Sequence, residues 1–275
     1  MESLLHNILD YITFLKTQFA LSISLHLDQE YSLKCYALGF EKLLSHSIHL
    51  NPYCLQVKAD GKRYEKCMRC QKRVLFKCQT TQHFEGTCLF GVAEFVHGVY
   101  VNQKPVGFVS VSGYQSKRPP LKGLSNLYDR NMKKHPLPSS LLCDIIPPLC
   151  RMTEYFIRSF ATLKESPSPQ KTEYQKILYY LYHHHATTNL EEVCRIFHRS
   201  KSFISHLFKK NSGYSLPYYC NLLKINSAKE LLKNTDLSVT EVSLAVGFND
   251  LSYFITFFKK INGLSPLQWK KTHSL

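Results

Sequence analysis

One stretch decides the fold of this chain: LSVTEVSLAVGFNDLSYFITFFKKINGLSPLQW, residues Leu237–Trp269. Ser238 and Glu241 have the spacing of a capping box, which predicts that a helix begins there. Gly247 can take the positive φ that a turn between two helices needs, and Asn249 or Asp250 can cap the next helix. The stretch therefore predicts a helix-turn-helix.

The second predicted helix has two different faces. Its inward face carries four aromatic residues, Tyr253, Phe254, Phe257 and Phe258. Its outward face carries Ser252, Ile255, Thr256 and Lys259. Because the aromatic side would anchor the helix in a core, the outward side is free to enter a DNA major groove.

The same pattern occurs earlier in the chain, in residues 190–220, LEEVCRIFHRSKSFISHLFKKNSGYSLPYYC. Residues 50 positions apart correspond to one another: Phe203, Phe208, Lys209, Lys210, Gly213 and Ser215 match Tyr253, Phe258, Lys259, Lys260, Gly263 and Ser265. Apolar residues at helical spacing connect the copies: Leu222, Ile225, Ala228, Leu231 and Leu232. The repeat predicts two reading helices held apart by one connecting helix.

Composition agrees with a nucleic-acid partner. The formal net charge is +15 and the pI is about 9.3, which favours a polyanion. The first residues show no secretory signal, and no apolar run approaches the ~20 residues of a membrane helix. Ten cysteines without an export signal indicate a reducing compartment. We therefore expect a cytoplasmic protein with no membrane partner.

The region before residue 166 mixes helical and strand patterns. Helices are expected over 3–19 and 62–79, a strand over 22–27, and a hairpin of strands 95–100 and 106–111. A helical pattern over 139–163 is interrupted by Pro147-Pro148, and the Pro- and Ser-rich segment after it marks a boundary. We expect an α+β domain over 1–165, a linker over 166–171 and an all-α domain over 172–275. The helix-turn-helix units of the all-α domain should span about 190–211 and 238–261.

Four segments together resemble the AraC/XylS family of bacterial transcription regulators: KINSAKELL at Lys224–Leu232, then TEVSLAVGF, SYFITFFKK and GLSPLQW. The resemblance covers Tyr174 to Lys271. It implies two helix-turn-helix units on successive segments of the major groove of double-stranded DNA, about 34 Å apart. It also implies RNA polymerase as a partner and leaves a homodimer open. The first unit departs from the family in having Phe197-His198-Arg199 where a glycine is usual. His206 and Thr256 stand where the family often has a base-reading arginine.

These positions divide the expected DNA contacts into two groups. The phosphate contacts are expected from basic side chains, Lys201, Lys209, Lys210, Lys259 and Lys260. The base contacts are expected from the outward positions of the reading helices: Ser202, Ser205 and His206 in the first unit, and Leu251, Ser252, Ile255 and Thr256 in the second.

The N-terminal region carries a second resemblance. It has a series of cysteines, Cys54, Cys67, Cys70, Cys78 and Cys88, and the segment VHGVYVNQKPVGFVSVSG at Val96–Gly113. Together these resemble the PocR sensory domain of bacterial regulators. The resemblance implies a PAS-like mixed sheet with helices and a small effector molecule that controls DNA binding.

The cysteines leave alternatives open. Cys67 and Cys70 have the CxxC spacing of zinc sites, and Cys54 and Cys88 could complete a site for zinc or another metal. Neighbouring basic residues would favour a redox role, whereas buried thiols can simply line a core. A methyl-accepting DNA-repair domain is the enzymatic alternative. Since no nucleophile–base pair or phosphate-cradling loop is readable, we expect a ligand-controlled regulator and not an enzyme.

Overall fold

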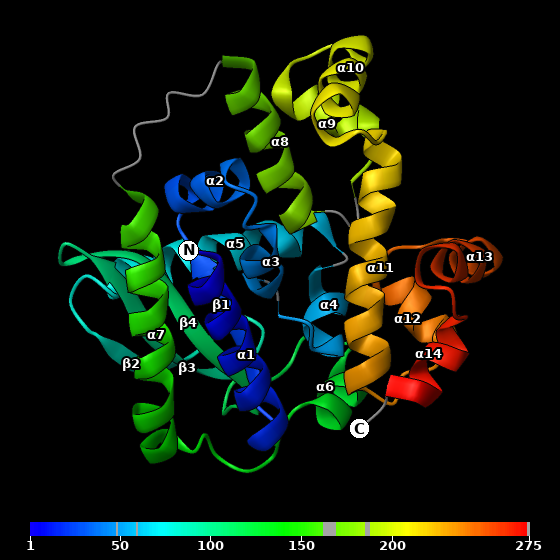
Figure 1. Cartoon of the computed structure of the whole chain (residues 1–275). Coiled ribbons are helices and arrows are strands. Elements are labelled where there is room, and N and C mark those ends of the chain that lie inside the picture. The colour runs from blue at the N-terminus through cyan, green and yellow to red at the C-terminus, as the bar shows by residue number, and fades with distance from the viewer. Residues whose placement is uncertain (48, 59, 162–168, 185–187, 274–275) are drawn as a thin grey trace. The chain divides into compact units, whose positions relative to one another are not determined.

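The computed structural model describes residues 1–47, 49–58, 60–161, 169–184 and 188–273. It divides into two compact units, Met1–Glu165 and Ser166–Leu275 (Figure 1). Each unit has its own core. None of the described helices is long and apolar enough to cross a membrane.

The N-terminal unit is built on a four-stranded sheet with the order β1-β4-β3-β2. Its strands are β1 (Ser22–Leu27), β2 (His83–Thr87), β3 (Val92–Val101) and β4 (Lys104–Gln115). Every neighbouring pair runs antiparallel, so the expected mixed sheet is wrong in this respect. The physical reason is that short connections join β2 to β3 and β3 to β4, and a short connection between neighbouring strands reverses the chain.

The expected hairpin is present and longer than the sequence pattern indicated. Asn102 and Gln103 join β3 to β4 with φ values of 50° and 63°. Positive φ at both turn residues matches the right-handed twist of the strands that follow. The strand at 22–27 is also as expected. Strand β2 was not expected, because HFEGT has little apolar alternation.

Helices cover the sheet. The main ones are α1 (Glu2–Gln18), α5 (Gly61–Lys77) and α7 (Ser139–Ala161), with shorter helices α2 (Gln29–Ala37), α3 (Glu41–Leu44), α4 (Pro52–Lys58) and α6 (Ser125–Asn131) and the 3-10 turn η1 (Ser45–Ser47). Helix α7 packs on β3 and β4 and lies beside α1. Helix α5 packs against the sheet through Val74 and Leu75, which contact Val96 and Phe108.

Helix α7 corrects one expectation. It runs from Ser139 to Ala161 with Pro147 and Pro148 inside it, and so is not interrupted there. Proline removes a backbone donor and disfavours the helix by roughly 3 kcal/mol. Fully buried Leu142, Ile146 and Leu149 offset that cost by packing the helix into the core.

In its described residues the C-terminal unit has helices and no strand: α8 (Pro169–His184), α9 (Leu190–Phe197), α10 (Lys201–Ser212), α11 (Leu216–Asn234), α12 (Val239–Ala245), α13 (Leu251–Asn262) and α14 (Pro266–His273). Helix α8 starts at Pro169, so the end of the expected linker is helical; proline suits a first helical position because its missing N–H has no partner there anyway. The earlier linker residues 166–168 lie outside the described residues.

Candidate nucleic-acid interface and sensor cavity

The two helix-turn-helix units are α9–α10 and α12–α13, and side-chain caps define how each helix begins. The Ser238–Glu241 capping box is formed at α12. Asp250 Oδ1 accepts a hydrogen bond from Tyr253 N at 3.0 Å, and Ser200 Oγ accepts one from Phe203 N at 3.2 Å. These bonds satisfy amides that would otherwise lack partners, so both reading helices begin at definite residues.

Helices α10 and α13 end in the same way. Gly213 and Gly263 close them in the left-handed region, with φ of 76° and 75°. The turns inside the units differ, however. Gly247 has φ of 87° in the second unit, whereas His198 takes φ of 52° in the first. In the left-handed region a residue with a side chain has a higher backbone energy than glycine. The turn of the first unit is therefore locally less favourable than that of the second.

The burial pattern of α10 repeats in α13. Ile204, Leu207 and Phe208 are buried in α10, and Phe254, Phe257 and Phe258 are buried at the corresponding positions of α13. Because these residues recur at helical spacing, each helix has one anchored side and one free side.

Tyr253 corrects the expected inward face. It is 49 % exposed, and its hydroxyl accepts a hydrogen bond from Asn221 Nδ2 at 3.1 Å. Four rings at i, i+1, i+4 and i+5 spread over a wide arc of the helix, and Tyr253 lies at one edge of that arc. Its ring contacts Phe257, with centroids 5.7 Å apart, and its hydroxyl reaches the surface.

Every residue expected to contact a base is exposed. The set is Ser202, Ser205, His206, Leu251, Ser252, Ile255 and Thr256. Leu251 and Ile255 are each 37 % exposed, which is a large apolar exposure for a helix with a packed opposite side. These side chains form two separate exposed surfaces, one on each reading helix.

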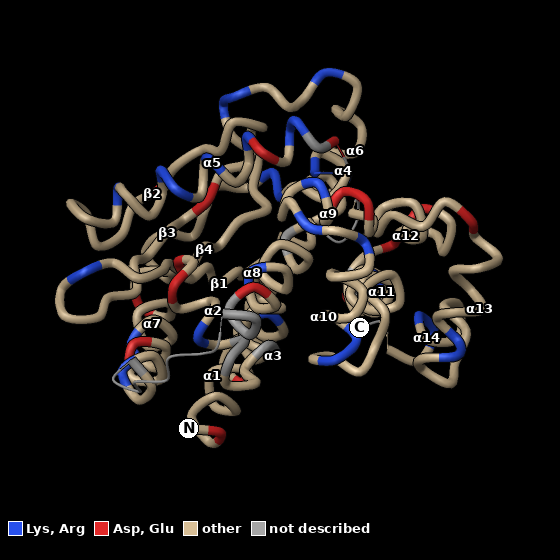
Figure 2. Tube along the Cα trace, turned by 90° about the horizontal axis from the view of Figure 1, so that it is seen from above, with Lys and Arg blue, Asp and Glu red and all other residues tan. Residues whose placement is uncertain are grey.

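The expected phosphate contacts are exposed as well, at Lys201, Lys209, Lys210, Lys259 and Lys260. Figure 2 shows the basic and acidic residues along the chain, and neither reading helix contains an acidic residue. Lys201 differs from the others because its Nζ lies 2.7 Å from Glu191 Oε1. That ion pair raises the pKa of Lys201, and it would have to be exchanged for a phosphate.

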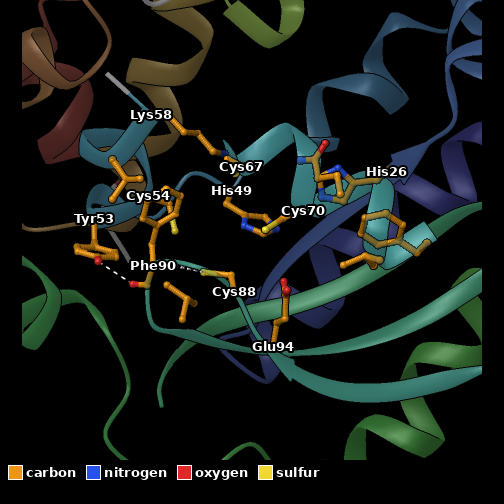
Figure 3. Close-up of a pocket in the computed structure, with 15 residues that line it drawn as sticks. His26, His49, Tyr53, Cys54, Lys58, Cys67, Cys70, Cys88, Phe90 and Glu94 are labelled. Carbon is orange, nitrogen blue, oxygen red and sulfur yellow. Dashed lines mark hydrogen bonds between the residues drawn. The ribbon is translucent and has the colours of Figure 1, made fainter. Parts of the chain in front are cut away.

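The N-terminal unit contains a small cavity of about 40 Å³. Four of the cysteines line it: Cys54 from α4, Cys67 and Cys70 from α5, and Cys88 between β2 and β3 (Figure 3). Cys78 is instead buried between α5 and the sheet. The fold thus brings together residues that are 34 positions apart in the sequence.

The cavity wall is mainly apolar and its polar groups are largely bonded within the protein. Tyr53 Oη donates to Phe90 O at 2.7 Å and accepts from Leu121 N at 2.8 Å. His49 Nε2 lies 3.1 Å from Ser110 Oγ, and burial lowers the pKa of His49 to about 3. Ser24 joins this network, 2.9 Å from Ser110 Oγ and 3.0 Å from His26 Nε2.

Burial favours the protonated form of three of the lining thiols. It raises the pKa of Cys88 to about 12, and it raises the pKa values of Cys54 and Cys67 as well. A reactive cysteine needs the opposite shift, because the thiolate is the nucleophile. No three His, Cys, Asp or Glu side chains within the described ranges are arranged around one ion.

Lys58, His49 and Glu94 line the cavity and were not singled out from the sequence. Glu94 lies within an apolar strand, where a lone acidic residue is the only signal that could have identified it. Burial raises the pKa of its carboxyl to about 7.

Comparison with known proteins concerns the C-terminal unit. Residues 193–272 match the family model described as a helix-turn-helix domain. The chain is 37 % identical over 83 residues to the uncharacterized HTH-type transcriptional regulator YijO of Escherichia coli (strain K12), covering 30 % of this chain and 29 % of that protein. It is 29 % identical over 106 residues to the regulatory protein PocR of Salmonella typhimurium, covering 38 % of this chain and 35 % of that protein.

Among solved structures, the C-terminal domain of the response regulator AraT from Geobacillus stearothermophilus is 28 % identical, with a TM-score of 0.37 over 40 % of this chain and 91 % of that one. The matches with YijO and PocR cover well under half of the length of each of these two curated relatives. The shared part is the helix-turn-helix domain.

Proposed function

We propose that this chain, whose C-terminal unit is a helix-turn-helix domain of the AraC type, is a sequence-specific transcription regulator controlled by a small molecule. One observation carries the DNA-binding part of the proposal. The two reading helices have the same anchored side and the same exposed side, offset by 50 residues, with a lysine pair at the end of each.

Lysines and base-reading residues have different roles in this proposal. Lys201, Lys209, Lys210, Lys259 and Lys260 neutralise phosphates, which supplies most of the affinity and its dependence on salt. Ser202, Ser205 and His206 read one half-site, and Leu251, Ser252, Ile255 and Thr256 read the other. Since the second set includes an aliphatic side chain, it should prefer a thymine methyl at one position.

The N-terminal unit is proposed to be a PAS-like sensor related to the PocR sensory domain. The support is a mostly apolar cavity with few free polar groups, the usual construction of a small-molecule site. An effector that binds the DNA-competent state more tightly than the other state would shift the equilibrium between the two states. The size of the shift is the difference between the effector's binding free energies for them, typically about 1–3 kcal/mol. RNA polymerase and a second copy of the chain are further proposed partners.

We also propose that the cysteines serve as cavity wall and hold no resident metal. The support for a wall role is the burial of Cys54, Cys67 and Cys88, which raises their pKa values, and the lack of a suitable ligand arrangement among the described residues. The same raised values disfavour a methyl-accepting thiol, so the protein is proposed to act by binding alone.

Selection from a random DNA library tests the proposal. The full chain should enrich one bipartite site whose halves lie about 10 base pairs apart, because the two reading helices belong to one rigid domain. Variants at Lys259 and Ile255 should then behave differently. A Lys259 variant should bind all DNA sequences more weakly, whereas an Ile255 variant should lose its preference at one base pair of the site. Binding without any sequence preference at physiological salt would contradict the proposal.

A further inference from the structure

Glu94 lies on the face of β3 that lines the cavity, two residues after Val92, which lines it too. The sheet is irregular beside it: Ala93 pairs with Tyr114 and Phe95 with Val111, so Glu94 alone lies opposite Ser112 and Gly113. Gly113 takes φ of 93° at this bulge, a value that suits glycine. Bulges are frequent beside binding sites. In Figure 3, the Glu94 carboxylate points into the cavity.

The Glu94 carboxyl has no hydrogen-bond or ion-pair partner among the residues the structure describes. Its accessible surface faces the cavity, while protein atoms surround the group elsewhere, and burial alone raises its pKa to about 7. Burying a carboxylate without a partner is costly, and such groups in native proteins are concentrated at functional sites. The missing partner is therefore expected from a ligand.

A second charged group lines the same cavity. Lys58, at the C-terminal end of α4, contributes to the wall and forms no ion pair with a described residue. Its positive charge acts on the nearby groups of Cys54, Cys67 and His49. It does not lower the pKa of Glu94. The cavity thus contains two opposite charges that do not neutralise each other, with thiols between them.

The remaining wall offers little else to a polar ligand. The other side chains are mainly aromatic, aliphatic or sulfur-containing: Tyr53, Val57, Val74, Phe90, Val92 and Phe108, with the thiols. The Tyr53 hydroxyl and the His49 imidazole are already bonded to protein groups. A well-matched ligand is consequently polar at two ends and apolar between them.

We propose that this cavity binds a small zwitterion, with its ammonium group at Glu94, its carboxylate at Lys58 and its short apolar body against the aromatic and sulfur wall. The inference specifies the effector class and rests on the proposed effector-controlled function. A simple amine would leave Lys58 unpaired, a simple carboxylate would leave Glu94 unpaired, and a neutral molecule would leave both. Discrimination against all three follows from the cost of an unpaired buried charge.

Calorimetric titration of the full chain tests the proposal with four matched probe sets. The zwitterions are the smallest aliphatic α-amino acids and unbranched ω-amino acids, because the cavity is small. The comparison sets are amines, carboxylates and alcohols with the same carbon skeletons. At least one zwitterion should bind, and its three counterparts should bind at least about tenfold more weakly.

Variants show which groups make the contacts. Glu94→Gln and Lys58→Met should each lower the affinity for the zwitterion by at least about tenfold, since each leaves one ligand charge unpaired. Glu65→Gln and Lys62→Met, at exposed positions of α5, change the same charges outside the cavity and should leave affinity unchanged.

The pH dependence provides an independent readout. Glu94 must be ionised to bind an ammonium group, so affinity should fall as pH falls from about 8 to about 6. The titratable and charged groups that line the cavity with Glu94 are Cys54 and Lys58 of α4, Cys67 and Cys70 of α5, Cys88, Tyr53, His49 and His26 of β1. Burial places the pKa values of Cys54, Cys67 and Cys88 above this window and that of His49 below it. The dependence should vanish in Glu94→Gln, which separates Glu94 from His26.

The outcomes separate this inference from the proposed function. Binding of alcohols as tight as that of zwitterions, or binding unaffected by Glu94→Gln, overturns the zwitterion assignment and leaves effector control intact. No binding by any zwitterion of the panel also overturns the assignment. Zwitterion binding that leaves DNA affinity unchanged supports the assignment and contradicts effector control.

Discussion

Ile255 is the residue at which base reading can be tested most directly. It is 37 % exposed on α13, whose other side is anchored by buried Phe254, Phe257 and Phe258. An aliphatic group in the major groove can contact a thymine methyl and cannot hydrogen-bond to a base edge. We expect Ile255→Ala to cost about 1–3 kcal/mol of preference at one A·T pair.

Replacing the contacted thymine by uracil should have the same effect, because it removes the methyl group from the other partner. Competition binding of the wild type and Ile255→Ala to the thymine and uracil DNAs gives the coupling energy between the Ile255 side chain and the thymine methyl. If the two changes are additive, Ile255 does not contact that methyl. If Ile255→Ala unfolds the domain, the outward assignment of this face is wrong.

Lys259 is expected to contact a DNA phosphate through its charge and not to recognise a base. The residue is exposed in the last turn of α13, beside Lys260. Lys259→Ala should weaken specific and non-specific DNA by similar factors and should reduce the slope of log affinity against log salt by about one. Fluorescence anisotropy at several salt concentrations measures this. A loss confined to one sequence would instead indicate a base contact.

Glu94 gives the N-terminal unit a definite pH dependence of stability. Its folded pKa of about 7 lies above the ordinary value of 4.5, so the unfolded state releases this proton first as pH rises. Its contribution to stability is complete below pH 4.5 and is lost as pH rises towards 7. The full shift corresponds to about 3 kcal/mol, an upper estimate.

Glu94→Gln should therefore gain stability over the wild type between these pH values, by up to about 3 kcal/mol, and the difference should level off above about pH 7. Urea unfolding of the N-terminal unit at a series of pH values measures it. Glu65→Gln controls for the loss of one negative charge on the surface. A difference that does not change with pH would mean that the carboxyl is accessible to solvent.

At the scale of elements, the turn between α9 and α10 is the least favourable local conformation in the DNA-binding unit. His198 caps α9 in the left-handed region, where a glycine has no steric penalty. His198→Gly should stabilise the unit by about 1 kcal/mol and leave DNA affinity unchanged. Chemical denaturation measures the change.

Thr235 supplies the matched control, since it caps α11 in the extended region with φ of −143°. Thr235→Gly increases the freedom of the unfolded chain without relieving any strain, and it removes the hydrogen bond from Thr235 Oγ1 to Leu231 O. This variant should be destabilising. If both glycine variants stabilise the unit, the backbone conformation at His198 is not the cause.

At the scale of the whole molecule, the two compact units should separate functionally. The fragment 167–275 contains all of the proposed DNA contacts and a core of its own. It should fold and bind DNA with the salt dependence of the full chain, and it should not respond to any effector. Circular dichroism and anisotropy test this. A folded fragment without DNA binding at low salt would contradict the central proposal.

Metal content is the second test at this scale. Purified full-length protein should contain less than one equivalent of zinc or iron, and the double variant Cys67→Ser, Cys70→Ser should remain folded. Both expectations follow from the proposal that these cysteines form part of the cavity wall. Elemental analysis and thermal unfolding are the measurements. Stoichiometric metal that is lost together with folding in the double variant would make the cysteines a metal site.

The local signals in the sequence were sufficient for the C-terminal unit. Capping residues, glycine positions and aromatic spacing act within one or two helical turns, so Ser238, Asp250 and Gly263 predicted where α12 and α13 begin or end. The errors were at edges of such patterns. Tyr253 lies at the margin of its aromatic face, and Pro147 and Pro148 sit in a helix that burial stabilises.

The sequence by itself determined the duplicated helix-turn-helix, the exposure of the outward helix positions and the centre of the hairpin, strands 95–100 and 106–111, because each depends on contacts between near neighbours in the chain. Only the tertiary structure decided the antiparallel sheet and the cavity. Lys58, Cys54, Cys67, Cys88 and Glu94 come from four separate segments. Burial, which follows from the packing of those segments, sets the pKa of Glu94 and keeps the thiols protonated. Residue type alone cannot specify either property, because both depend on which distant atoms exclude water.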